Sequence, residues 1–93
     1  MESKKSTQIN YGHVAAVMPD GTAAPDIMTE EEVIRYLRLH EIGVKNPANT
    51  LRNYRGQGLL RSTQIGGRKV YYRKSIVEFV EEMTYLTDER RKR

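Results

Sequence analysis

The sequence predicts a small α+β fold, mainly α-helical, whose elements follow the order helix, loop, helix, β-hairpin, helix. Three observations lead to this fold class. Helix-start signals stand at Thr29 and at Asn46, and a glycine pair, Gly66-Gly67, separates two β-prone runs. A stripe of apolar residues then repeats with helical spacing from Ile76 to Leu86.

We assign the folded domain to residues 27–86, and we expect a disordered N-terminal arm at 1–26 and a basic C-terminal tail at 87–93. A chain of 93 residues has room for one small domain. The N-terminal arm holds few apolar side chains, and these follow no sustained period. It therefore buries too little surface to offset the entropy cost of ordering.

The first helix is predicted to begin after Thr29 and to end near Leu39. Thr29 is a suitable N-cap, and Glu32 follows at the spacing of a capping box. Met28 and Val33 flank this cap as a hydrophobic staple. The apolar face of the helix consists of Val33, Ile34, Tyr36 and Leu37.

A second helix is predicted over residues 47–55, after a loop in which Ile42 and Val44 are expected to turn back onto the core. Asn46 provides the N-cap, and Pro47 takes the first helical position, where its missing N–H has no cost. Gly58 is the expected left-handed residue that ends this helix.

A β-hairpin and a third helix complete the predicted fold. The runs Thr63–Ile65 and Val70–Tyr72 are β-prone, and Gly66-Gly67 between them predicts a tight turn. The third helix is predicted to start at Lys74 or Ser75, because Ser75 and Glu78 have capping-box spacing. Its apolar stripe consists of Ile76, Phe79, Val80, Met83 and Leu86.

The charges of the chain are strongly segregated. The formal net charge is +4, yet the segment from Ile42 to Val77 has eight basic residues and no acidic residue. A surface of this kind suits a polyanion, because each Lys or Arg that meets a phosphate releases condensed counterions. The basic residues of this segment are Lys45, Arg52, Arg55, Arg61, Arg68, Lys69, Arg73 and Lys74.

Two helices followed by a hairpin are the layout of a winged helix-turn-helix, which reads DNA with its second helix. Six segments of the chain follow a familiar order and spacing: 28–33, 36–37, 50–54, 58–60, 65–68 and 71–79. In these segments the chain resembles the excisionase-type helix-turn-helix family, a MerR-like winged-helix module of phage, mobile-element and bacterial regulatory proteins. The loop before the second helix is longer here than the short turn of that family.

This resemblance implies that the second helix is the recognition helix and that the glycine-tipped hairpin also contacts DNA. Carried onto this sequence, it implies DNA contacts by Asn49, Thr50, Arg52, Asn53, Arg55, Arg68 and Lys69. From their charge and place, Arg73 and Lys74 are expected to bind phosphate near the start of the third helix. For Arg55 the alternative is compensation of the helix dipole. A solvated surface side chain is the alternative for Arg52, Asn53, Arg68, Lys69, Arg73 and Lys74.

The expected function is sequence-specific binding of double-stranded DNA by a small excisionase-like protein, as a recombination accessory factor or a transcriptional regulator. Its expected partners are duplex DNA and either a recombinase or a second copy of the chain. Two alternatives remain open. One is a phage DNA-packaging component of the small-terminase kind, and the other is a non-catalytic adaptor that binds an acidic protein.

Other functional classes find little support in the sequence. The chain has no cysteine, and its two histidines, His13 and His40, have no ligand-spaced partners, so we expect no metal and no other cofactor. No nucleophile, base and orienting group can be assembled, and we expect no enzymatic activity. We expect no small-molecule effector, because the sequence shows neither the long dimerising helix nor the effector domain of MerR-type activators. We also expect no membrane association and a cytoplasmic location, because neither a membrane span nor a signal peptide is present.

Overall fold

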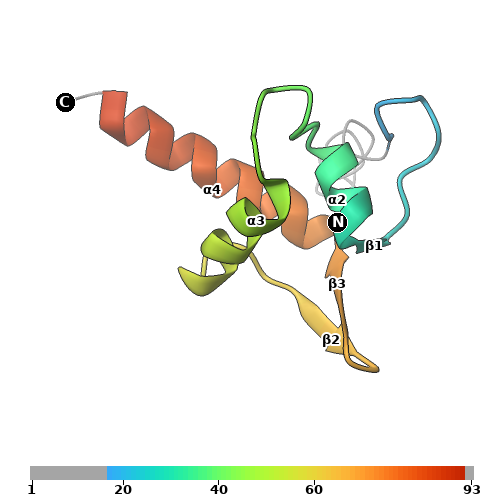
Figure 1. Ribbon diagram of the computed structural model, residues 1–93. Coiled ribbons are helices and arrows are strands. Elements are labelled where there is room, and N and C mark those ends of the chain that lie inside the picture. Colours follow the sequence, from blue (N-terminus) through green and yellow to red (C-terminus); the bar gives the residue numbers. More distant parts are fainter. Residues whose placement is uncertain (1–16, 92–93) are drawn as a thin grey trace, which may run out of the picture.

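A three-stranded antiparallel sheet and three helices make up the part of the chain that the computed structural model describes, residues 17–91 (Figure 1). This arrangement confirms the predicted α+β class and the predicted order of helices and hairpin. It also contains a short strand ahead of the first helix that the sequence did not predict. The elements are β1 (Ile27–Thr29), α2 (Glu30–Tyr36), α3 (Pro47–Gly56), β2 (Thr63–Ile65), β3 (Arg68–Tyr72) and α4 (Arg73–Arg91).

The predicted starts of α2 and α3 are confirmed by their hydrogen bonds. The N–H of Glu32 donates to Thr29 Oγ1 over 3.2 Å, and the N–H of Thr29 donates to Glu32 Oε1 over 2.9 Å, which completes the capping box of α2. In α3, Asn46 Oδ1 accepts from the N–H of Asn49 over 3.2 Å. These caps satisfy backbone donors that a helix leaves unpaired at its N-terminal end.

The end of α3 is also as predicted. Gly58 has a φ of 79°, in the left-handed region. The N–H of Gly58 donates to the carbonyl of Arg55 over 3.0 Å, and the N–H of Leu59 donates to the carbonyl of Tyr54 over 3.0 Å. This pair of bonds is a Schellman motif, and it directs the chain away from the helix axis toward Leu60, which is buried.

The sheet has the strand order β1-β3-β2, so β3 lies in its centre. The predicted hairpin is confirmed: β2 pairs with β3, and Gly66 and Gly67 both have positive φ in the turn between them. Strand β1 pairs with the other half of β3, with Met28 opposite Tyr71. Val70 is the residue of β3 that has a partner on both sides, Thr29 and Thr63.

The connection between α2 and α3 is a series of tight turns. Helix α2 ends at Tyr36, earlier than predicted, and Arg38 follows with a φ of 58°, which is incompatible with a continuing right-handed helix. The N–H of Ile42 then donates to the carbonyl of Arg38 over 3.0 Å. Leu39 is buried and Val44 packs on the core, but Ile42 is 68% exposed. The prediction that Ile42 turns back onto the core is therefore wrong.

The disordered N-terminal arm was predicted to extend too far along the chain. Val17 and Ala23 form a β-bridge, Met18 is buried, and the side chain of Asp20 accepts two hydrogen bonds from Thr22. The arm prediction is therefore wrong for residues 17–26, because a buried methionine and a local turn hold this segment. The remainder of the predicted arm, residues 1–16, lies outside the described residues.

Helix α4 is longer than predicted at both ends. It begins at Arg73, whose N–H donates to the carbonyl of Asp26 over 2.8 Å, so Ser75 lies inside the helix instead of capping it. At its other end α4 continues to Arg91, so most of the predicted C-terminal tail, residues 87–93, is helical. Residues 92–93 lie outside the described residues.

The hydrophobic core joins the sheet to all three helices. Tyr54 of α3 and Phe79 of α4 lie with ring centroids 5.1 Å apart, as expected of core aromatic residues. The second half of α4 extends away from the sheet (Figure 1), and among the described residues no helix is long and apolar enough to span a bilayer. The buried cluster consists of Met28, Val33, Ile34, Leu39, Leu51, Leu60, Tyr71, Ile76 and Phe79.

Candidate nucleic-acid interface

Helix α3 has one continuous polar face. Asn49, Arg52 and Asn53 are all exposed and follow the spacing i, i+3, i+4, so they lie together on one side of the helix. Leu51 is 1% exposed and docks the opposite side of α3 onto the core. Three of the predicted site residues are thus presented to solvent side by side. Amide and guanidinium groups in this arrangement can bond to adenine and guanine edges.

The other two predicted residues of α3 lie elsewhere. Thr50 is half-buried and lines an apolar groove of about 520 Å³ between the α2–α3 connection and α4. The side chain of Arg55 is 17% exposed, and its guanidinium is occupied by contacts within the protein. The predicted DNA contacts of Thr50 and Arg55 therefore find no support in the geometry.

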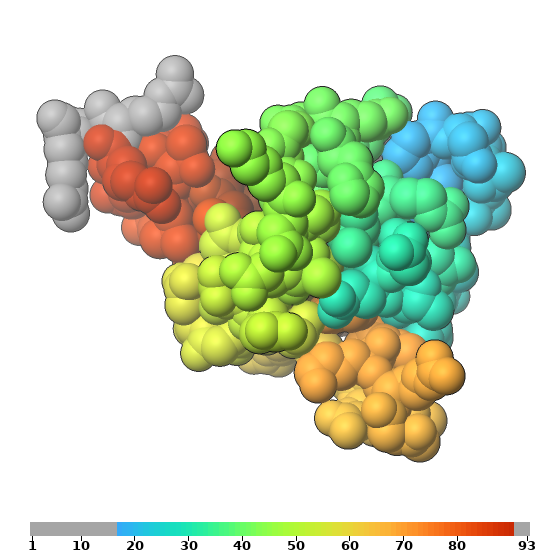
Figure 2. Space-filling view, viewed as in Figure 1, coloured from blue at the N-terminus to red at the C-terminus, as the bar shows by residue number. Residues whose placement is uncertain are grey.

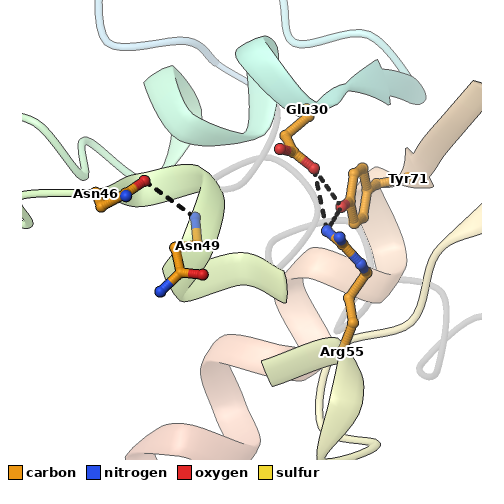
Figure 3. A network of polar contacts seen from close by, with 5 residues as sticks. All are labelled: Glu30, Asn46, Asn49, Arg55 and Tyr71. Carbon is orange, nitrogen blue, oxygen red and sulfur yellow. Dashed lines mark hydrogen bonds and ion pairs between the residues drawn. The ribbon is translucent and has the colours of Figure 1, made fainter. Parts of the chain in front are cut away.

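Arg55 belongs to a network of polar contacts that joins three elements (Figure 3). Arg55 Nη1 donates to Glu30 Oε1 over 3.0 Å and to the hydroxyl oxygen of Tyr71 over 2.6 Å. The Tyr71 hydroxyl in turn donates to Glu30 Oε1 over 3.0 Å. Each member bonds to both others, so the end of α3, the start of α2 and strand β3 meet at this point. We name these three residues the Glu30–Arg55–Tyr71 network.

Burial in this network changes the protonation chemistry of Tyr71. Removal from water raises the pKa of its hydroxyl above the ordinary value of 10.0, and the hydrogen bond to Glu30 and the charge of that carboxylate raise it further. The nearby Arg55 opposes these effects, but the pKa of Tyr71 remains raised. Ionisation of Tyr71 is therefore less favourable in the folded protein than in the unfolded chain.

Stability is accordingly expected to fall in alkaline solution. A raised pKa in the folded state means that the contribution of Tyr71 is complete below its ordinary pKa of 10.0 and is lost as the pH rises through the folded value. In Tyr71→Phe, the unfolding free energy measured by urea titration should decline less steeply above about pH 10. Burial also raises the pKa of Tyr36, so part of the decline should remain.

The matched control for this experiment is Tyr72→Phe, which removes the same hydroxyl from a residue that is 56% exposed. Its pH profile should follow that of the natural chain. If the unfolding free energy of Tyr71→Phe fell as steeply above about pH 10 as that of the natural chain, Tyr71 would not be a source of this pH dependence.

The hairpin carries Arg68 and Lys69, which are both exposed. Because successive side chains of a strand point to opposite faces, Lys69 lies on the same face of β3 as buried Tyr71, and Arg68 lies on the face of exposed Tyr72. The two positive charges therefore flank the hairpin, one on each face, and do not form a single cluster. Figure 2 shows the hairpin projecting beyond the body of the molecule, on a side where α3 is also visible.

The two predicted residues at the start of α4 differ from each other. Arg73 Nη2 forms an ion pair with Asp26 Oδ1 over 2.7 Å, and the Arg73 side chain is 22% exposed. Lys74 is exposed. Arg73 therefore joins the residue before β1 to the start of α4, and its predicted role in phosphate binding loses support, whereas Lys74 remains exposed.

Sequence reasoning missed the acidic partners that occupy Arg55 and Arg73. The sequence prediction gives Glu30 no partner and includes Asp26 in the disordered arm. No local pattern marks either pair, because Glu30 lies 25 residues from Arg55 and Asp26 lies 47 residues from Arg73. Within residues 17–91 no group of three or more His, Cys, Asp or Glu side chains could hold a metal ion.

Of the nine predicted site residues, the structure therefore leaves six exposed: Asn49, Arg52, Asn53, Arg68, Lys69 and Lys74. They come from α3, the hairpin and the start of α4, and no acidic residue occurs between Ile42 and Val77. Comparisons with protein-family models, with curated proteins and with solved structures found no match to this chain.

Proposed function

We propose that this chain binds double-stranded DNA in a sequence-specific manner, as a small excisionase-like winged helix-turn-helix protein. In this proposal α3 is the recognition helix in the major groove, and the β2–β3 hairpin is the wing on the flanking DNA. The observation that carries the proposal is the exposed face of Asn49, Arg52 and Asn53 on α3, next to a hairpin with two exposed cations.

The charges of the described surface favour a polyanionic ligand. Within the segment from Ile42 to Val77, two of the arginines, Arg55 and Arg73, are paired with acidic residues, and the other six basic residues are exposed. Phosphate contacts from the hairpin and Lys74 would fix the position of the protein on the duplex. Contacts from α3 would distinguish base pairs. Separate elements for positioning on the duplex and for distinguishing base pairs suit an accessory factor in recombination or a regulator of transcription.

The salt dependence of duplex binding tests this proposal. If Arg52, Arg68, Lys69 and Lys74 each meet a phosphate, the logarithm of the association constant should fall against the logarithm of salt concentration with a slope of about −4. Replacing both Arg68 and Lys69 with alanine should reduce the steepness by about 2. The measurement is a fluorescence anisotropy titration of a labelled duplex at several salt concentrations.

Arg90→Ala is the control, because it removes one charge from an exposed position near the far end of α4. Its slope should match that of the natural chain. An affinity that hardly changes with salt would contradict the proposal, and binding of an acidic protein in place of the duplex would favour the adaptor function.

A further inference from the structure

We propose that Glu30, Arg55 and Tyr71 are positioning residues, which set the distance and angle between α3 and the hairpin. This inference rests on the proposed function. It assigns Arg55 a role in DNA recognition that requires no contact with DNA, and it makes an acidic residue, Glu30, a contributor to the binding of a polyanion.

The first step of the argument is the occupancy of the Arg55 guanidinium. Its Nη1 donates to two acceptors within 3.0 Å, and the side chains of Arg55 and Glu30 are only 17% and 32% exposed. Turning the Arg55 guanidinium outward to a phosphate would break both bonds of Nη1 and leave a half-buried carboxylate without its cation. Leaving such a charged group unpaired is unfavourable, whereas Arg52, one turn earlier, is already exposed.

The second step is the position of the network between the two proposed DNA-binding elements. Arg55 lies in the last turn of α3, and Tyr71 lies in β3, the strand that forms the second half of the hairpin. Figure 3 shows the Arg55 side chain extending from α3 toward Tyr71 and Glu30. The first residue of α2 therefore connects the C-terminal end of α3 to the base of the hairpin.

The third step is the consequence for binding. A duplex that meets α3 and the hairpin at the same time needs both elements in one fixed relation. A protein that already holds this relation loses less conformational entropy on binding. The network should therefore favour duplexes whose bases meet α3 while their flanking phosphates meet the hairpin. Its loss should lower the affinity for such duplexes more than the affinity for other duplexes.

The test compares two acidic residues that are neighbours on α2. Glu30→Ala and Glu31→Ala each remove one negative charge from the first turn, but Glu31 is exposed and lies outside the network. A purely electrostatic effect predicts tighter duplex binding for both variants, and more so for Glu30→Ala, because it frees Arg55. The positioning role predicts that Glu30→Ala weakens preference, whereas a sequence-independent electrostatic effect raises both affinities and leaves preference unchanged. The ratio of the two affinities therefore separates the two explanations.

The measured quantity is the ratio of affinities of the full chain for a duplex selected from a random pool and for a scrambled duplex of equal length. In Glu30→Ala this ratio should fall about tenfold, the effect expected from the loss of hydrogen bonds to a charged group. In Glu31→Ala it should stay within about twofold of the natural chain. An unchanged or larger ratio in Glu30→Ala overturns the positioning role and leaves the proposed function intact.

Tyr71→Phe provides the second measurement, and it decides the matter if circular dichroism shows that Glu30→Ala is unfolded. This variant changes no charge, so the slope of affinity against salt should not change, but the ratio should still fall. An unchanged ratio in folded Tyr71→Phe overturns the positioning role. A natural chain that shows no preference for any duplex would instead contradict the proposed function itself.

Discussion

Replacing Arg52 and Asn53 together with alanine is expected to remove most of the sequence preference of duplex binding while the protein stays folded. Both side chains are exposed on α3, and neither forms a hydrogen bond or ion pair within the described part of the chain. Each well-placed contact to a base edge is worth about 1–3 kcal/mol of discrimination. Alanine also favours helical structure, so α3 should persist.

The measurement is competition between a selected duplex and a scrambled duplex, with the fold monitored by circular dichroism. Binding to both duplexes should converge toward one weak, salt-dependent affinity. Arg90→Ala, which also removes an exposed arginine, should keep the full preference. A double variant that discriminates as well as the natural chain would show that α3 is not the recognition helix.

Leu51→Ala is expected to have the largest effect on stability. Leu51 is 1% exposed and belongs to the core cluster beneath the polar face of α3. Truncating a buried leucine to alanine costs about 2–5 kcal/mol, because transfer energy is lost and a cavity is left. Small domains have total stabilities of only about 5–15 kcal/mol, so this variant should lose a large part of its folded population.

Urea unfolding followed by circular dichroism measures this loss as a lower midpoint with an unchanged slope. Ile42→Ala is the control, because Ile42 is 68% exposed and its truncation should change stability by no more than about 0.5 kcal/mol. Equal midpoints for the two variants would contradict the assignment of Leu51 to a close-packed core.

Those parts of the fold that depend on neighbouring residues could be predicted from the sequence. The capping box of Thr29 and Glu32, the cap at Asn46 and the Gly66-Gly67 turn all follow from interactions within a few residues. Strand β1 could not be predicted in this way. It has only three residues, and its partner, β3, lies about 40 residues further along the chain. Its formation depends on tertiary pairing and hardly on local preference.

The candidate site shows the same limit. Asn49, Arg52 and Asn53 share one exposed face, which helical spacing alone determines. The ion pairs of Arg55 and Arg73 could not be predicted in this way, because their acidic partners lie 25 and 47 residues away in the sequence. A run of basic residues shows where positive charge is concentrated. It does not show which of those charges are already neutralised within the fold.

The two pairings of β3 have a mechanical consequence. Residues 68–70 pair with β2 and residues 70–72 pair with β1, so the two ladders overlap only at Val70. On the tip side of Val70, β3 is paired with β2 alone, and the next residue on the other side, Tyr71, lies in the Glu30–Arg55–Tyr71 network. A displacement of the glycine tip is therefore expected to reach the last turn of α3 through Val70 and Tyr71.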